Sequence, residues 1–349
     1  MTGDSKKLKT ILITGGAGFI GSNLVEYLFT RYPNYRLLVL DALTYAGKLD
    51  SLPQGIKGSP RFEFWHGNVC NGELVNALVS QASVVVHLAA ESHVARSVYD
   101  NRVFFETDVL GTQTVANAVV KHYRGVERFI HVSSSEVYGT GIEIPMTEGH
   151  PLNPATPYAS AKAGADRLVY SYVITYDIPA VIIRPFNNYG PHQHLEKVIP
   201  RFITRALRDE PLTIHGPGTS TRDWLFVEDS CAALDRAMHV DLERIRGRAV
   251  NVGTGRELDI LTIARRVLQA LGKPDTLMTF MRERPGQVAR HCAATQTARE
   301  LLGWEAQTSF EAGLDRTIDW YRNNREWWKE QVWMETVQIR TKSGEIDYH

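Results

Sequence analysis

The stretch "TILITGGAGFIG" (residues 10–21) decides the fold of this chain. Its opening "TILIT" is apolar and β-branched, as in a strand that is buried on both faces. Its glycines then follow the spacing G-x-x-G-x-x-G at Gly15, Gly18 and Gly21. Glycine permits a tight turn and a close approach of backbone to ligand, and a helix that starts there offers free N–H groups to an anion. We therefore predict a strand, a turn and a helix that bind the pyrophosphate of a dinucleotide.

A second strand-like run, "RLLVLD" (residues 36–41), ends in Asp41, about 20 residues after Gly21. A carboxylate at this position accepts hydrogen bonds from the two hydroxyls of the adenosine ribose and repels a 2′-phosphate. The cofactor is therefore expected to be NAD rather than NADP.

The first half of the chain alternates short apolar runs with helical stretches. Because these runs lack a period of two, they indicate parallel strands that helices cover on both faces, which is a Rossmann-like, doubly wound parallel sheet of the α/β class. Proline and glycine interrupt the pattern after residue 185, where a smaller mixed α/β C-terminal substrate lobe is expected. We assign residues 1–185 to an NAD-binding domain, to which the chain returns later, and residues 186–349 mainly to the second lobe. Strands are expected at residues 10–14, 36–41, 62–67, 83–90, 128–134 and 180–185.

Composition excludes several classes of protein. Lysine plus arginine equals aspartate plus glutamate at 39 each, so no long-range field favours nucleic acid or an anionic membrane. The three cysteines are widely spaced, which argues against a disulfide framework and a structural zinc site, and we expect no metal. No apolar run approaches the ~20 residues of a membrane-spanning helix. A cytoplasmic location is expected.

Two long helical segments, residues 96–123 and 157–176, mix apolar and small side chains. Packing on the sheet explains them, and so does pairing with the same helices of a second copy. A homodimer through a four-helix bundle is one expectation.

The motifs "TGGAGFIG", "HLAAES" and "YASAK" together resemble the extended short-chain dehydrogenase/reductase superfamily, and most closely its nucleotide-sugar 4,6-dehydratases. The stretches "LDALTYAGKLDSL", "FNNYGPHQHLEKVIPRFI" and "STRDWLFVEDS" extend this likeness over nearly the whole chain. The resemblance implies a Rossmann lobe for NAD and a second lobe for the nucleotide sugar. It assigns the cofactor to Gly15, Gly18, Phe19, Ile20, Gly21, Asp41, Asn68, Val69, Leu88, Ala89, Ala90, Tyr158 and Lys162.

The redox residues follow from the Tyr-x-x-x-Lys motif of the superfamily, which Tyr158 and Lys162 match. This spacing places both side chains on one helical face, where the ammonium is expected to lower the pKa of the phenol from about 10. Tyr158 then takes the proton of the sugar 4-hydroxyl as C4 is oxidised. The resemblance also implies that Ser134 forms a hydrogen bond near the 4-oxygen.

The pair Ser135–Glu136 is the main departure from the dTDP-glucose dehydratase pattern. Glu136 matches the base that removes the C5 proton, but an aspartic acid usually precedes it and protonates the departing C6 hydroxyl. With Ser135 there, either Glu136 serves as both base and acid, or the chemistry differs. A Ser-Glu pair also occurs in GDP-mannose dehydratases, which eliminate water, and in UDP-glucuronate decarboxylases, which do not.

Substrate contacts are implied by further matching positions. Arg222 matches a phosphate-binding arginine, whose guanidinium suits oxyanions. Ala95 and Asp108 replace a family aspartate and asparagine, Asn68 replaces the aspartate that meets adenine, and "RPGQVARHC" lacks the usual "GHDRRY". These departures leave the base and the sugar open. The substrate-binding residues are expected to be Asn187, Asn188, Glu196, Lys197, Arg222 and Asn251.

Three functions compete. The first is an NAD-dependent nucleotide-diphosphate-hexose 4,6-dehydratase, a lyase that oxidises C4, eliminates water across C5 and C6 and returns hydride to C6. The second is a UDP-glucuronate decarboxylase or a 4-epimerase that uses the same tyrosine, lysine and NAD. The third, a non-catalytic NAD-binding regulator, is disfavoured by the intact Tyr158, Lys162 and Glu136.

Overall fold

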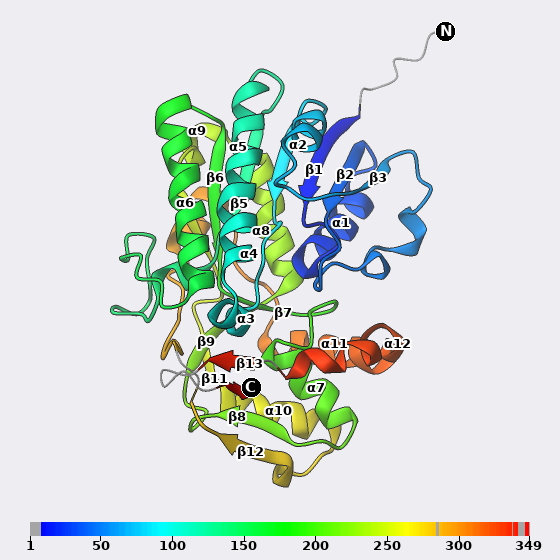
Figure 1. Ribbon diagram of the computed structural model, residues 1–349, viewed down its shortest axis with the longest axis vertical. Coiled ribbons are helices and arrows are strands. Elements are labelled where there is room, and N and C mark those ends of the chain that lie inside the picture. The colour runs from blue at the N-terminus through cyan, green and yellow to red at the C-terminus, as the bar shows by residue number, and fades with distance from the viewer. Residues whose placement is uncertain (1–7, 284–285, 337, 341–345, 349) are drawn as a thin grey trace.

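The structure is a computed structural model that describes residues 8–283, 286–336, 338–340 and 346–348. Figure 1 shows a large sheet with its helices in the upper part of the molecule and a smaller lobe of strands and helices below it.

The large sheet contains seven parallel strands within the described residues, in the order β10-β6-β5-β4-β1-β2-β3. The predicted fold class is confirmed. The last strand, β10, follows the expected boundary near residue 186 and pairs with β6, so the chain does return to the first lobe. The boundary itself stays a prediction. The strands are β1 (Lys9–Thr14), β2 (Tyr35–Asp41), β3 (Phe62–His66), β4 (Val84–His87), β5 (Arg128–Val132), β6 (Ala180–Pro185) and β10 (Ala249–Val252).

Helices cover both faces of this sheet because successive side chains of each strand point to opposite sides. Ile11 and Ile13 pack into one buried cluster with helices α1 and α8, whereas Leu12 packs into another with α2, α5 and α6. The covering helices are α1 (Phe19–Arg31), α2 (Gly72–Val79), α5 (Thr112–Lys121), α6 (Pro157–Tyr176), α8 (Val227–His239) and the short α9 (Leu242–Ile245).

The expected single helix over residues 96–123 is wrong. Helix α3 (Val94–Tyr99) ends at Asp100, whose backbone is extended, and the chain restarts as α4 (Arg102–Phe104). A π-helical segment, η3 (Phe105–Gly111), then leads into α5. Asp100 and Asn101 are residue types whose side chains compete with helical hydrogen bonding, which explains the break.

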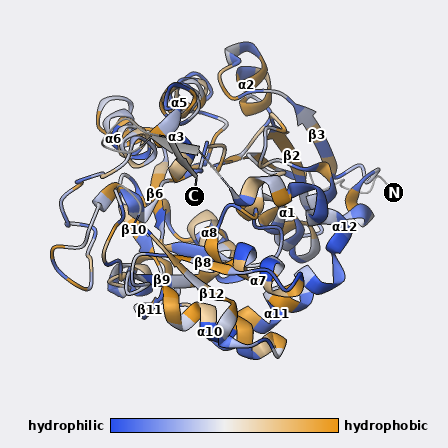
Figure 2. Ribbon diagram, turned by 60° about the horizontal axis from the view of Figure 1, so that its bottom comes forward, coloured by the Kyte–Doolittle hydropathy of each residue, from blue (hydrophilic) through white to orange (hydrophobic). Residues whose placement is uncertain are grey.

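The smaller lobe has its own buried core. Trp224 and Phe226 of β9 and Phe202 of α7 belong to this core. Apolar and polar residues alternate along α10 and α11, as expected for helices with one buried face (Figure 2). Its elements are α7 (Val198–Leu207), α10 (Ile260–Leu271), α11 (Phe310–Asn323), α12 (Arg325–Trp328), β7 (Asn187–Tyr189), β8 (Leu212–His215), β9 (Thr221–Phe226), β11 (Glu257–Asp259) and β12 (Met278–Met281), with β13 (Gln338–Arg340) and β14 (Ile346–Tyr348) near the C-terminus.

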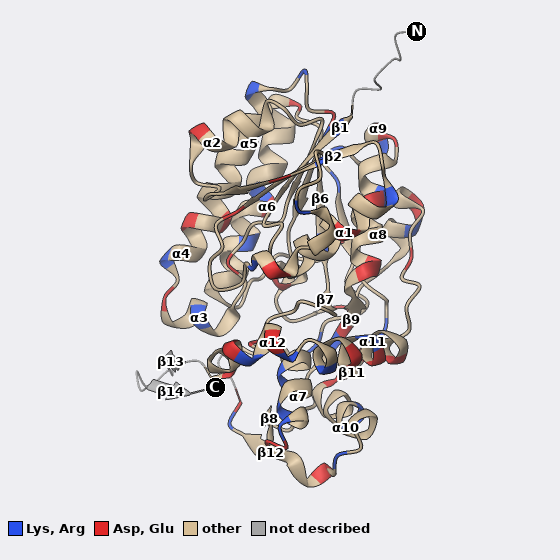
Figure 3. Cartoon of the chain, turned by 90° about the vertical axis from the view of Figure 1, so that its right-hand side faces the viewer, with Lys and Arg blue, Asp and Glu red and all other residues tan. Residues whose placement is uncertain are grey.

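Charged residues of both signs are interspersed along the helices, as Figure 3 shows for α11 and α12. This distribution agrees with the balance of acidic and basic residues in the sequence. Among the residues that the structure describes, no helix is long and apolar enough to cross a membrane.

Candidate active site

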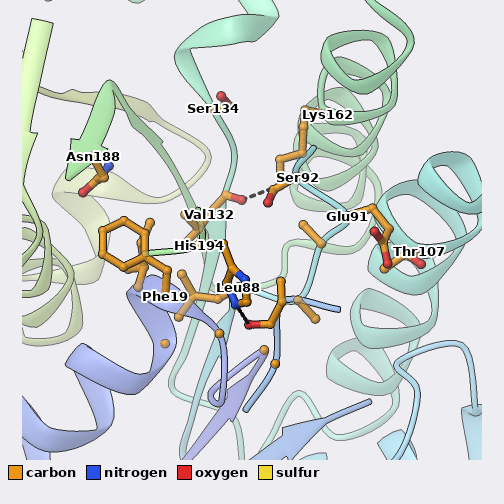
Figure 4. Close-up of a pocket in the computed structure, with 18 of the residues that line it drawn as sticks. Phe19, Leu88, Glu91, Ser92, Thr107, Val132, Ser134, Lys162, Asn188 and His194 are labelled. Atoms are coloured by element: carbon orange, nitrogen blue, oxygen red, sulfur yellow. Dashed lines mark hydrogen bonds between the residues drawn. The ribbon is translucent and has the colours of Figure 1, made fainter. Parts of the chain in front are cut away.

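A large cavity opens at the carboxyl ends of the parallel strands, where doubly wound folds bind their ligands. Figure 4 looks into it, with Ser134 and Lys162 at the top, Phe19 at the lower left and Glu91 on the right. The predicted residues that line this cavity are Gly15, Gly18, Phe19, Ile20, Gly21, Asp41, Asn68, Val69, Leu88, Ala89, Ala90, Ser134, Ser135, Glu136, Tyr158, Lys162, Asn187, Asn188, Glu196 and Lys197.

The glycine-rich turn fits a pyrophosphate. Gly15 has φ +70°, and a Cβ there would lie 2.6 Å from the backbone nitrogen of Ala89. A Cβ on Gly21 would lie 2.1 Å from the Gly15 carbonyl oxygen, so neither position tolerates a side chain. Helix α1 begins after Gly18 without a side-chain cap, which leaves its first N–H groups available to an anion.

Asp41 is fixed at the end of β2. Its Oδ2 accepts a 2.9 Å hydrogen bond from the Ala17 N–H, and its Oδ1 accepts one of 2.8 Å from the Leu43 N–H. Burial raises the pKa of Asp41, and the backbone N–H donors act in the opposite direction. The carboxylate is thus held beside the glycine-rich turn, where the ribose of a dinucleotide would lie.

Helix α6 presents the redox residues. Thr156 caps the helix, with its side chain accepting from the Ala159 N–H, and Pro157 occupies the first turn. The ammonium of Lys162 is buried and donates a 2.8 Å hydrogen bond to the carbonyl of Val132 on β5. Tyr158 and Lys162 therefore face the same cavity, as their spacing predicted.

The expected effect of Lys162 on Tyr158 is not found. Burial raises the pKa of the Tyr158 phenol well above its ordinary value, and the negative charges of Asp108 and Glu136 raise it further. The hydrogen bond with Ser134 lowers it, by less than burial raises it. Burial is the largest of these effects, and the pKa of Tyr158 in the protein alone is raised rather than lowered.

Asp108, on the π-helical segment, adds a buried carboxyl group near Lys162. Its Oδ1 accepts a 2.8 Å hydrogen bond from the Glu91 N–H, while Oδ2 has no hydrogen-bond partner among the described residues. Burial raises the pKa of Asp108 and lowers that of Lys162, and the two charges oppose these shifts. Burial also raises the pKa of the cavity-lining Glu91 to about 7. In the sequence, Asp108 was identified only as the replacement of a family asparagine. Glu91 was missed, although it is the glutamate of the motif "AAES".

The segment that carries Glu136 is a short turn, η4 (Ser135–Tyr138), directly after β5. Ser134 caps it, because its Oγ accepts a 3.2 Å hydrogen bond from the Glu136 N–H. Ser135 is buried, whereas the Glu136 side chain is 17% exposed. Glu136 lines the first cavity and also a second one, so it stands where the two meet.

The second cavity lies between α3 and the smaller lobe and is rich in basic groups, including Lys197 and Arg222. Arg222 comes from β9, and its guanidinium donates a 2.9 Å hydrogen bond to the Thr221 carbonyl. Burial lowers the pKa of Arg222, and the charge of Glu136 raises it. A cavity with these cations suits the phosphates of a nucleotide sugar.

Glu196 and Lys197 line both cavities, as does Asn187. The Glu196 carboxylate is buried between His93 Nε2 at 3.5 Å and Lys197 Nζ at 3.3 Å. Lys197 Nζ also donates a 2.6 Å hydrogen bond to the Ser92 carbonyl. These contacts hold the ammonium at the junction of the cavities.

The structure does not bring Asn251 to either cavity lining, and the expected phosphate contact is therefore not supported. Asn251 is fully buried in β10, where it accepts a 2.7 Å hydrogen bond from the Tyr138 hydroxyl and donates one of 2.9 Å to the Met146 carbonyl. Asn188 does line the first cavity, but its side chain is engaged with the Phe186 carbonyl and the Ser230 hydroxyl. Within the described parts of the chain, no group of three or more His, Cys, Asp or Glu is arranged to hold a metal ion.

The fold and this pair of joined cavities define a nucleotide-sugar enzyme of the extended short-chain dehydrogenase/reductase superfamily. The family described as GDP-mannose 4,6 dehydratase matches residues 12–317, and the chain belongs to it. The resemblance read from the motifs is thereby confirmed.

Relatives of this chain share most of its length. It is 43% identical over 316 residues to the low-salt glycan biosynthesis protein Agl12 of Haloferax volcanii, with 90% of this chain and 99% of that protein covered. It is 40% identical over 324 residues to dTDP-glucose 4,6-dehydratase of Mycobacterium tuberculosis, with 91% of this chain and 95% of that protein covered. The crystal structure of DesIV, a dTDP-glucose 4,6-dehydratase from Streptomyces venezuelae with NAD and TYD bound, superposes on this chain with a TM-score of 0.88. The two sequences are 38% identical, and the superposition covers 92% of this chain and 99% of that one.

Proposed function

We propose that this protein is an NAD-dependent nucleotide-diphosphate-hexose 4,6-dehydratase that makes a 4-keto-6-deoxy sugar. The observation that supports this most is the position of Glu136, which lines both cavities beside the Tyr158 and Ser134 pair. A carboxylate at this point reaches a carbon next to the one that Tyr158 and the cofactor oxidise. Simple dehydrogenation needs no such base.

The cofactor is NAD. The turn at Gly15 and Gly21 leaves room for a pyrophosphate, and Asp41 offers its carboxylate to the ribose hydroxyls while repelling a 2′-phosphate. When bound, NAD supplies the hydride acceptor for C4 and the donor for C6.

The chain's own residues move the protons. Tyr158 takes the proton of the 4-hydroxyl in its phenolate form, and Ser134 holds the 4-oxygen through its hydroxyl. Lys162 lines the same cavity and would orient the nicotinamide ribose. Oxidation at C4 makes the C5 proton acidic. Glu136 then removes this proton while the C6 hydroxyl leaves as water.

Ser135 supports a division of labour that differs from the usual aspartate-glutamate pair. Its hydroxyl is buried beside Glu136, and an alcohol is a weak acid. Glu136 therefore carries the proton taken from C5 to the departing C6 hydroxyl. The phosphates of the substrate are assigned to Arg222 and Lys197, and Asn187 and Glu196 to the sugar between them.

Ser135 also supports the second candidate, a UDP-glucuronate decarboxylase or a 4-epimerase, because the Ser-Glu pair is shared with the decarboxylases. The product separates them: dehydration removes water from the sugar, decarboxylation removes carbon dioxide, and epimerisation conserves mass. Mass spectrometry of a panel of TDP-, UDP-, GDP- and CDP-hexoses and UDP-glucuronate tests the proposal directly. Loss of water from a hexose in wild type and not in Glu136→Gln is expected, and carbon dioxide loss from UDP-glucuronate alone contradicts it.

A homodimer through α5 and α6 is part of the same proposal, as is a cytoplasmic location. The two helices lie side by side on one face of the sheet (Figure 1), and α6 exposes Tyr170 and Ile174, the latter 68% exposed. Ile174→Glu should yield a monomer in light scattering after gel filtration. Ile142→Glu, at an equally exposed residue outside both helices, is the control.

A further inference from the structure

His291 lies behind the active site and links its two halves. The imidazole is fully buried, and its Nε2 lies 2.5 Å from the carbonyl oxygen of Gly139, the residue that ends η4. The backbone N–H of His291 donates a 3.1 Å hydrogen bond to the carbonyl of Thr221 on β9. One residue is thus joined to the segment that carries Glu136 and to the strand that carries Arg222.

The contact with Gly139 fixes which ring nitrogen bears hydrogen. A carbonyl oxygen only accepts, so Nε2 must be the donor, and in the neutral ring Nδ1 is then an acceptor. Nδ1 is buried without a hydrogen-bond partner among the described residues and lies 4.0 Å from Glu136 Oε1. Two acceptors that face each other in a buried site are unfavourable unless a proton lies between them.

We propose that Glu136 and His291 share one proton and act as a pair, with His291 as the proton store that allows Glu136 to serve first as base and then as acid. This inference rests on the proposed function and concerns the same site. The separation of 4.0 Å is closed by rotation of the carboxylate or by one bridging water. The pair thus supplies the acid that Ser135 cannot provide for the departing C6 hydroxyl.

Over one catalytic cycle the Glu136–His291 pair gains as many protons as it loses. At rest the pair holds one proton, and its transfer to Nδ1 frees the Glu136 carboxylate. The carboxylate forms a bond to the C5 proton, the C5–H electrons become the C5=C6 double bond, and the C6–O bond breaks. The leaving hydroxide takes a proton from Glu136 and departs as water, so the pair holds one proton again. That proton is available for C5 when the double bond is reduced, and solvent then restores it.

The charged groups around His291 act in different directions. Burial lowers the pKa of the imidazole, Glu136 on η4 raises it, and Arg222 on β9 and His150 lower it. Glu136 is therefore a charged neighbour that favours a proton on His291, and the hydrogen bond to the Gly139 carbonyl acts in the same direction. Phe186 packs against the ring at 6.0 Å between centroids and adds no charge.

The pair can be tested without turnover. Wild-type and Glu136→Gln proteins, saturated with NAD and labelled with ¹⁵N-histidine, are titrated by NMR, and His291 is assigned by loss of its signals in His291→Gln. The glutamine keeps a donor for the Gly139 carbonyl. We expect His291 to titrate at least about one pH unit higher in wild type than in Glu136→Gln, because an adjacent carboxylate stabilises the imidazolium. Equal midpoints overturn the proposal.

Kinetics supply the second measurement. In His291→Gln, oxidation at C4 should keep its wild-type rate, whereas deuterium entry at C5 from solvent should slow by at least about tenfold. A purely structural role would slow both steps together, and that result also overturns the proposal. If wild type dehydrates no hexose of the panel while the NMR difference persists, the dehydratase function is wrong and the proton-sharing pair stands.

Discussion

Asp166 and Arg184 form a buried bidentate ion pair beneath helix α6. Both guanidinium–carboxylate hydrogen bonds measure 2.8 Å, and both side chains are almost fully buried. Asp166 is one turn beyond Lys162 on α6, and Arg184 stands on β6. The pair therefore fixes the register of the catalytic helix against the sheet.

Asp166→Asn should destabilise the protein by about 3–5 kcal/mol, because it leaves the Arg184 charge buried and unpaired. Asp177→Asn removes an exposed ion pair with Arg246 and should cost less than about 1 kcal/mol. Urea unfolding measures both. A loss for Asp166→Asn no larger than that of the control contradicts the anchoring role.

The same pair predicts acid sensitivity. Burial raises the pKa of Asp166, but the hydrogen bonds and charge of Arg184 outweigh it and lower the pKa to about 2. The stabilisation is thus present above the unfolded value near 3.9 and lost as pH falls toward 2. The difference in the free energy of unfolding between wild type and Asp166→Asn should therefore become smaller as the pH falls over that range.

Asp41→Ala should weaken NAD binding by about 10- to 100-fold and relax discrimination against NADP, since a charged acceptor contributes about 1.5–3 kcal/mol. Calorimetric titration with both cofactors measures this. Asp50→Ala, at an exposed acidic residue outside both cavity linings, should change neither affinity. Wild-type protein that binds NADP as tightly as NAD would show that Asp41 is misassigned.

Tyr158→Phe should lower turnover by at least about 10²-fold, because it removes the group that accepts the 4-hydroxyl proton. NAD affinity and melting temperature should stay close to wild type. Tyr170→Phe, at an exposed residue on the same helix, is the matched control. Near-normal activity of Tyr158→Phe ends the case for this mechanism.

Asp108→Asn should stabilise the protein most at alkaline pH. Burial raises the pKa of Asp108 to about 7, so wild type gains stability from its neutral form below about 4 and loses it as pH rises through 7. The asparagine can still accept from the Glu91 N–H. Between pH 5 and pH 8 the variant should gain at least about 1 kcal/mol on wild type in urea unfolding. Glu106→Gln, an exposed carboxyl on the same segment, should show no such trend.

The sheet and its cofactor edge could be predicted because their signals are local. Apolar runs such as residues 180–185 lack alternation, which indicates buried parallel strands, and the spacing of the glycines predicts the turn. The break at Asp100 could not be predicted, since a single acidic residue in an otherwise helical pattern is common. The substrate contact expected of Asn251 is not supported for a different reason: its motif matched, but its burial depends on Tyr138 and Met146, which are distant in sequence. His291 could be identified only when the fold placed it beside Glu136. Glu91 stands in the motif "AAES", but its contact with Asp108 depends on the fold.

The pair Ser135 and Glu136 allows the sharpest separation of steps. Glu136→Gln should still oxidise C4, because that step depends on Tyr158 and Lys162, but it should stall before elimination. Absorbance of reduced nicotinamide should therefore persist after mixing with the substrate, and deuterium entry at C5 should fall by at least about 10²-fold. Exchange at C5 and release of water at the wild-type rate would show that Glu136 is not the base.

Substitutions of Ser135 complete this test. Ser135→Ala should lower the rate of elimination much less than Glu136→Gln does, since the serine hydroxyl is too weak an acid to drive the departure of the C6 hydroxyl. Ser135→Asp places a carboxyl group beside that hydroxyl and should raise the rate of elimination, measured as the decay of the reduced-nicotinamide absorbance. Because Ser135 is buried and lines the cofactor cavity, NAD affinity is measured alongside to exclude a change in the pocket. A Ser135→Ala variant as impaired in elimination as Glu136→Gln would assign the acid to the serine and remove the need for a proton store.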